Sequence, residues 1–161
     1  MAPPPLTLQS TANPAPPRVA IVVAAYNAWI TDKLRDGALS ELARRTGGAG
    51  AATVVPVPGA FEIPTAASAA ARSGRFDAVV TLGCIIKGET IHDEVIAHAV
   101  AGEIARIGAD TRMPVVLGVL TVNAAHQAEA RAGGAAGNKG AEAMGAALEL
   151  LGTLNALKQL S

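Results

Sequence analysis

The stretch that decides the fold is residues 78–86, which reads AVVTLGCII. It is a continuous apolar run of strand length, and similar runs occupy residues 19–24, 53–57 and 115–120. None of these runs alternates apolar with polar residues, as expected for strands that are covered on both faces. We therefore predict four buried strands in one parallel sheet.

Helical patterns follow each of the four predicted strands. The first has apolar residues four apart from Ile30 to Leu42, with Asn27 as its predicted cap and Gly47-Gly48 as its end. Four more are predicted: from Pro64 to about Ser73, from about His92 to Ile107, after a cap at Asn123, and from near Asn138 onward. The residues of the third helix expected to face the core are Val95, Ile96, Ala99, Val100 and Ile104. The alternation of strand and helix predicts an α/β three-layer sandwich with right-handed crossovers.

Composition excludes several classes of protein. Lys and Arg number 13 against 13 Asp and Glu, so no nucleic-acid partner or anionic membrane surface is expected. No apolar run approaches the ~18 residues of a membrane span, and no signal peptide is evident. A single cysteine, Cys84, rules out an intramolecular disulfide and fits a reducing, cytoplasmic location. Aromatic residues make up only 2%, and a core of small side chains hints at stabilisation by association.

Residues 1–17 are rich in proline and are predicted to form an extended arm ahead of a single domain at residues 18–161. Within the arm, Leu6–Leu8 could pair as an edge strand. The alternative interpretation of the same residues is a disordered tail.

The unusual residues of the sequence follow the ends of the predicted strands, where parallel sheets bind ligands. The turn Gly88-Glu89-Thr90 precedes a helix and could bind an anion, and Arg131 could add a bidentate contact to a phosphate. His92 begins the same helix, and its imidazole could transfer protons near neutral pH. Each also has a plainer interpretation, as a turn, a surface charge or a capping residue.

Two further side chains fit a ligand that has a flat ring and hydroxyl groups. Tyr26 could stack on the ring, and Glu62 could accept hydrogen bonds from hydroxyls. Judged alone, Tyr26 is as well explained by packing, and Glu62 by a first-turn position in the next helix. Phe61 is predicted to lie in the core, and Cys84 to be inert packing in a buried strand.

Four sets of residues, in order and in register over about residues 18–155, carry a resemblance. They are VPGAFEIP at 57–64, LGCIIKGETIH at 82–92, GVLT at 118–121, and RAG at 131–133 with GNKG at 137–140. Together they resemble the 6,7-dimethyl-8-ribityllumazine synthase family of riboflavin biosynthesis. The resemblance implies a flavodoxin-like fold and the condensation of 5-amino-6-(D-ribitylamino)uracil with 3,4-dihydroxy-2-butanone 4-phosphate. It implies no metal and no organic cofactor.

The resemblance also implies site residues. His92 matches the family's proton-transfer histidine, and Tyr26 an aromatic that stacks on the pyrimidine. The remaining implied substrate contacts are Ala60, Phe61 and Glu62 to the ribityl chain, Ile85, Ile86 and Lys139 near the pyrimidine, and Gly88, Glu89, Thr90 and Arg131 to the phosphate. Leu117, Arg131 and Lys139 are expected to serve the pocket of a neighbouring subunit. Departures from the family pattern are Lys87 for arginine, Ile91 for Pro or Thr, and Leu117 for an aromatic.

The family's assemblies imply a homo-oligomer, either a pentamer or an icosahedral shell of pentamers, with riboflavin synthase as a further partner. Two alternatives to the enzyme stay open on sequence grounds. One is a flavin- or lumazine-binding module without turnover, and the other is a cage in which catalysis is incidental.

Overall fold

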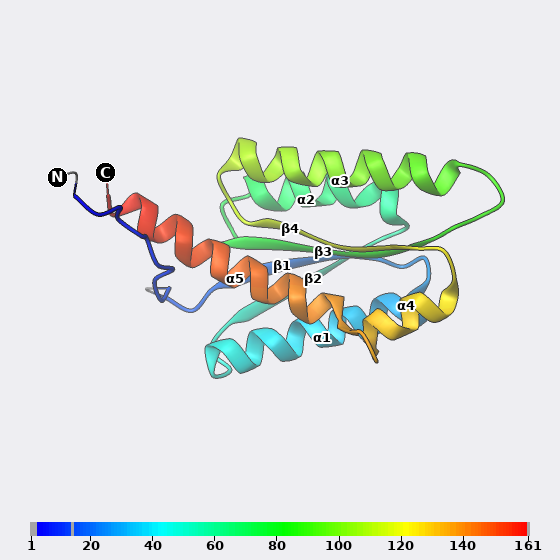
Figure 1. The fold of residues 1–161 in the computed structure, drawn as a ribbon, viewed down its shortest axis with the longest axis horizontal. Coiled ribbons are helices and arrows are strands. Elements are labelled where there is room, and N and C mark those ends of the chain that lie inside the picture. The colour runs from blue at the N-terminus through cyan, green and yellow to red at the C-terminus, as the bar shows by residue number, and fades with distance from the viewer. Residues whose placement is uncertain (1–2, 14, 161) are drawn as a thin grey trace.

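The computed structural model describes residues 3–13 and 15–160, and its centre is a four-stranded parallel sheet (Figure 1). The strands are β1 (Arg18–Ala24), β2 (Ala51–Val57), β3 (Ala78–Ile86) and β4 (Val115–Val122), in the order β2-β1-β3-β4. β2 lies on one side of β1, and β3 and β4 lie on the other side. The direction in which successive strands are added therefore reverses at β1, between β1 and β3.

Helices cover both faces of the sheet, as the α/β three-layer prediction requires. On one face lie α1 (Ala28–Thr46), α4 (Ala125–Arg131) and α5 (Lys139–Lys158), and on the other lie α2 (Ile63–Arg72) and α3 (His92–Thr111) (Figure 1). The short 3₁₀ helix η1 (Ala60–Glu62) links β2 to α2. No helix of the described residues is both long and apolar enough to cross a membrane.

The prediction that every strand is covered on both faces is confirmed for β1 and β3 and wrong for the outer strands. In β2 only Val57 is buried, and in β4 the buried residues alternate at positions 118, 120 and 122. The reason is position in the sheet, because β2 and β4 form its edges and the helices pack mainly over its middle.

The prediction for the core-facing side of α3 is also partly wrong. Val100 and Ile104 are buried as predicted and Ile96 is half-buried, whereas Val95 and Ala99 are exposed. The buried stripe continues to Ile107, and the helix itself runs on to Thr111.

Two predicted caps differ from the structure. Asn27 occupies the position before α1, but its side chain makes no capping hydrogen bond. Asn123 is not the cap of α4, because Ala124 takes that place and the Asn123 N–H donates to the Gln127 side chain at 2.8 Å. By contrast, Asn138 does cap α5, with its Oδ1 accepting from the N–H groups of Gly140 and Ala141.

The glycine-rich break after α4 is a small antiparallel hairpin of β5 (Ala132–Gly134) and β6 (Gly137–Asn138), which the sequence did not predict. Before β1, the described residues form neither helix nor strand, and Leu6–Leu8 pairs with no strand of this chain. This segment instead contacts α5, where the Ser10 hydroxyl donates to the Glu149 carbonyl oxygen at 3.1 Å.

Candidate active site

A cavity of about 790 Å³ lies at the carboxyl ends of β1 and β3, where the chain reverses direction across the sheet. Open α/β sheets bind ligands at this kind of position, because the loops diverge there and leave a crevice. The lining residues are Tyr26, Asn27, Gly59, Ala60, Phe61, Glu62, Cys84, Ile85, Ile86, Gly88, Thr90, His92, Asp93, Val95 and Ile96.

The structure brings together most of the residues that the sequence singled out. Nine of them line the cavity: Tyr26, Ala60, Phe61, Glu62, Ile85, Ile86, Gly88, Thr90 and His92. Glu89 lies in the same turn as Gly88 and Thr90 but does not line the cavity. Leu117, Arg131 and Lys139 also lie outside it, on β4, at the end of α4 and at the start of α5.

Backbone hydrogen bonds hold the loops that carry the two aromatic rings. Ala25 N–H donates to Val57 O at 2.7 Å, and Tyr26 N–H donates to Pro58 O at 3.0 Å. These bonds continue the pairing of β1 with β2 beyond the sheet and place Tyr26 beside η1. The Tyr26 side chain is 73% exposed and Phe61 is 60% exposed, so the prediction that Phe61 lies in the core is wrong. Two exposed aromatic side chains at one cavity suit a flat ligand.

The carboxylate of Glu62 lies close to the backbone of the β2–η1 loop. A Cβ added at Gly59 would be only 3.1 Å from Glu62 Oε2, so glycine leaves room for the carboxylate there. The acid therefore sits at the cavity, where it can accept hydrogen bonds from a polar ligand.

The turn before α3 has features that favour anion binding and one feature, a nearby carboxylate, that disfavours it. Among the described residues, the N–H groups of Glu89 and Thr90 have no hydrogen-bond acceptor, while Thr90 Oγ1 accepts from His92 N–H at 3.3 Å. Free N–H groups at a helix start attract anions. However, Asp93 Oδ1 lies 3.4 Å from Gly88 N and adds a negative charge to the same turn.

The charges on the cavity wall do not suit a phosphate by themselves. Among the described residues that line the cavity, Glu62 and Asp93 are acidic, His92 is the one basic side chain, and there is no lysine or arginine. Arg131 is exposed, and its guanidinium donates to the Gln127 carbonyl oxygen at 3.3 Å but pairs with no carboxylate of the described residues. Lys139 is paired with Glu142 at 3.1 Å.

Cys84 contributes an unreactive thiol to the cavity wall. Burial raises the pKa of this thiol to about 11, so it stays protonated at neutral pH. A protonated, buried thiol is a poor nucleophile, and its contribution is packing.

Sequence reasoning missed several lining residues, for identifiable reasons. The sequence pattern predicts Asn27 as a helix cap, and Val95 and Ile96 as core residues of α3. Asp93 had no distinguishing signal, because acidic residues are common in the first turn of any helix.

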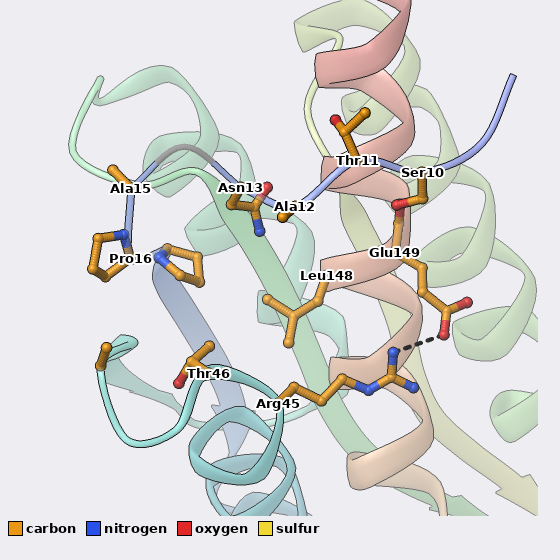
Figure 2. Close-up of a pocket in the computed structure, with 12 residues that line it drawn as sticks. Ser10, Thr11, Ala12, Asn13, Ala15, Pro16, Arg45, Thr46, Leu148 and Glu149 are labelled. Carbon is orange, nitrogen blue, oxygen red and sulfur yellow. Dashed lines mark hydrogen bonds and ion pairs between the residues drawn. The ribbon is translucent and has the colours of Figure 1, made fainter.

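A second cavity, of about 440 Å³, lies between the N-terminal residues, α1 and α5 (Figure 2). Its charged groups already bind each other, since Arg45 contacts Glu149 at 2.8 Å and Glu41 at 2.7 Å. Its charged side chains are therefore already paired. The residues that the sequence singled out gather instead at the cavity at the ends of β1 and β3, which is the candidate active site.

The comparison with known families agrees with this geometry. The family described as 6,7-dimethyl-8-ribityllumazine synthase matches residues 16–155, which is most of the chain and includes every element from β1 to most of α5. The chain therefore belongs to the 6,7-dimethyl-8-ribityllumazine synthase family.

Proposed function

We propose that the protein condenses 5-amino-6-(D-ribitylamino)uracil with 3,4-dihydroxy-2-butanone 4-phosphate to form 6,7-dimethyl-8-ribityllumazine, with release of phosphate and water. The observation that carries this proposal is the cavity at the ends of β1 and β3. There an exposed tyrosine, an acidic loop, an N–H-rich turn and His92 converge in a chain of this family.

The pyrimidine would lie between Tyr26 and the end of β3, where Ile85 and Ile86 provide an apolar wall. Aromatic and aliphatic surfaces hold a flat ring by burial and stacking. The ribityl chain would extend along η1, toward Ala60, Phe61 and the Glu62 carboxylate. Its hydroxyls can donate to that carboxylate.

The phosphate of the second substrate would bind at Gly88, Glu89 and Thr90. The N–H groups of Glu89 and Thr90, which have no acceptor in the described part of the chain, and the hydroxyl of Thr90 are suitable donors for its oxygens. When phosphate leaves, these fixed donors would stabilise the negative charge that develops.

His92 would move the protons of the condensation. The ring amine attacks the ketone to give a carbinolamine, which loses water to form an imine, and both steps need proton transfer. An imidazole can supply and remove protons in turn. Because both substrates are reactive by themselves, holding them together would account for much of the rate.

A complete site would need residues from a second copy of the chain. The wall of the cavity carries two carboxylates and no lysine or arginine, which leaves a phosphate without a full positive partner. Arg131, exposed and free of carboxylates among the described residues, would supply this charge from a neighbouring subunit, with Leu117 and Lys139 alongside. A ring of subunits provides such a shared site at each interface.

A turnover assay with both substrates tests the proposal. We expect lumazine, followed by absorbance and fluorescence, and inorganic phosphate to appear in equal amounts, with no added metal or cofactor. Lumazine binding without turnover would identify a binding module instead. A large assembly with neither activity would identify a cage.

A further inference from the structure

Asn27 has an unusual backbone conformation at the edge of the candidate active site. Its φ of 60° and ψ of 43° are left-handed, and among the described residues only Arg112 shares a positive φ without being glycine. Asparagine tolerates this conformation better than most residues. It directly follows Tyr26 and directly precedes α1.

The side chain of Asn27 binds to β3 rather than to its own helix. Its Nδ2 donates to the carbonyl oxygen of Cys84 at 2.9 Å. The pairing of β1 with β3 ends at Val23 and Leu82, so Cys84 lies beyond the last paired residue. The backbone of β1 has by then turned toward β2, and the Asn27 amide supplies the donor that a continuing strand would have provided.

This hydrogen bond spans two walls of the cavity. Tyr26 stands on one side, and Ile85 and Ile86, which follow Cys84 in β3, stand on the other. Backbone bonds tie Tyr26 to the β2 side, whereas the Asn27 amide ties the same loop to β3. The amide therefore fixes the separation between the backbone that carries Tyr26 and the β3 wall.

We infer that Asn27 is a positioning residue, which sets the affinity for the pyrimidine substrate by holding Tyr26 at a fixed distance from β3. This inference rests on the proposed function. It concerns one substrate only, because the turn at residues 88–90 that would bind the phosphate is not held by this bond.

Two variants remove the bond in different ways. Asn27→Gly keeps the left-handed conformation available but deletes the amide. Asn27→Asp keeps the shape but places a carboxylate oxygen against the Cys84 carbonyl oxygen. A neutral hydrogen bond corresponds to about one factor of ten, so we expect Asn27→Gly to raise the KM for the pyrimidine about tenfold and Asn27→Asp to raise it further. The KM for the butanone phosphate should change less than about twofold.

Thr31→Val is the matched structural control. Thr31 is buried, and its hydroxyl donates to the Ala24 carbonyl oxygen at 2.8 Å. This bond ties the first turn of α1 to the end of β1, and Thr31 does not line the cavity. Thr31→Val should lower the thermal midpoint and leave both KM values unchanged. If Asn27 had only a structural role, its variants would likewise lower the thermal midpoint and leave both KM values unchanged.

Near-ultraviolet circular dichroism gives a second readout, because Tyr26 and Trp29 are the only tyrosine and the only tryptophan. We expect Asn27→Gly to weaken the aromatic signal while the far-ultraviolet spectrum stays unchanged. Binding of 6,7-dimethyl-8-ribityllumazine, measured by quenching of its fluorescence, should weaken in parallel with the rise in KM.

The outcomes separate this inference from the proposed function. A wild-type protein that turns over, with folded Asn27→Gly and Asn27→Asp variants of unchanged pyrimidine KM, overturns the positioning role alone. If the wild-type protein neither turns over nor binds the lumazine, the proposed function fails and this inference fails with it.

Discussion

At the scale of single residues, His92 combines a position at the cavity with an exposed imidazole at the start of α3. It lies in the same turn as Thr90, whose hydroxyl accepts from the His92 N–H. The imidazole therefore lies next to the proposed phosphate site, where it could transfer the protons of the proposed condensation.

We expect His92→Ala to lower kcat by about 100-fold or less and to leave measurable turnover, because proximity of the reactants supplies much of the rate. His98→Ala is the matched control, since His98 is an exposed histidine on the same helix that does not line the cavity. Steady-state kinetics on both variants check this. Complete loss of turnover in folded His92→Ala would show that the histidine does more than transfer protons.

At the scale of elements, the close contact between α1 and α5 requires a glycine at position 140. A Cβ at Gly140 would collide with the backbone carbonyl of Leu34, so the first turn of α5 lies directly against α1. Asn138 strengthens this contact, because its Nδ2 donates to the Lys33 carbonyl oxygen at 3.0 Å while its Oδ1 caps α5.

We expect Gly140→Ala to lower the free energy of unfolding by about 1–3 kcal/mol, because the helices must separate. Gly102→Ala is the control, since Gly102 lies in α3 with no atom within 4 Å of the added Cβ. That change should be neutral or stabilising by up to about 1 kcal/mol. Urea unfolding at one protein concentration compares the two, and equal losses would argue against the helix contact as the cause.

An ion-pair network also joins the last turns of α1 to the middle of α5. Glu41 binds Arg44 at 2.7 Å and Arg45 at 2.7 Å. Figure 2 shows how Arg45 also reaches Glu149 on α5. Hydrogen bonds from Arg44 and then Arg45 lower the pKa of Glu41 to about 2. The folded protein thus holds the carboxylate form more strongly than the unfolded chain does.

This shift predicts a pH dependence of stability with a defined sign. The contribution of Glu41 is complete above about pH 4.5, the ordinary value for a glutamate, and is lost as the pH falls toward 2. Glu41→Gln should therefore cost about 1–2 kcal/mol at pH 7, after allowance for solvent screening, and little near pH 2. Urea unfolding at several pH values measures the difference.

Glu103→Gln is the control for that experiment. Glu103 is exposed and pairs with Arg106 inside α3 alone, so the pair connects no second helix. Its replacement should cost much less at every pH. A cost for Glu41→Gln that does not change between pH 7 and 2 would contradict the ion-pair explanation.

At the scale of the whole molecule, the described residues of one chain supply the aromatic, acidic and histidine parts of the proposed site but no lysine or arginine to line it. Arg131 lies at the end of α4, on the face of the sheet that also carries α1 and α5. A site shared between copies would bring Arg131 of one copy to the cavity of another. Assemblies that mix two kinds of chain can test this arrangement.

We expect co-refolded His92→Ala and Arg131→Ala chains, in equal amounts, to recover about a quarter of wild-type activity. By chance, a quarter of the interfaces pair an intact His92 with an intact Arg131. The quantity to measure is activity above the mean of the two variants assembled separately. A mixture that never exceeds that mean would show that His92 and Arg131 act from the same chain in each site, or that they do not belong to the site.

Much of the fold could be predicted from sequence, because local patterns carry it. The apolar runs identified all four strands of the main sheet, and Gly47, Pro64 and Asn138 mark helix boundaries where their backbone chemistry requires. The convergence of Tyr26, Glu62, Thr90 and His92 at one cavity followed from a simple rule, that parallel strands end at the same edge of a sheet.

What the sequence determined by itself is therefore the four strands of the main sheet, the five α-helices, the parallel arrangement of the strands and the end of the sheet where the cavity lies. Only the tertiary structure decided which strands are edges, that Val95 faces the cavity rather than the core, and that the Asn27 amide binds Cys84 instead of capping α1. The physical reason is the separation along the sequence over which each kind of interaction acts. Periodicity and capping act within a few residues, whereas strand order and the partner of a side chain 57 positions away depend on contacts that exist only once the sheet has assembled.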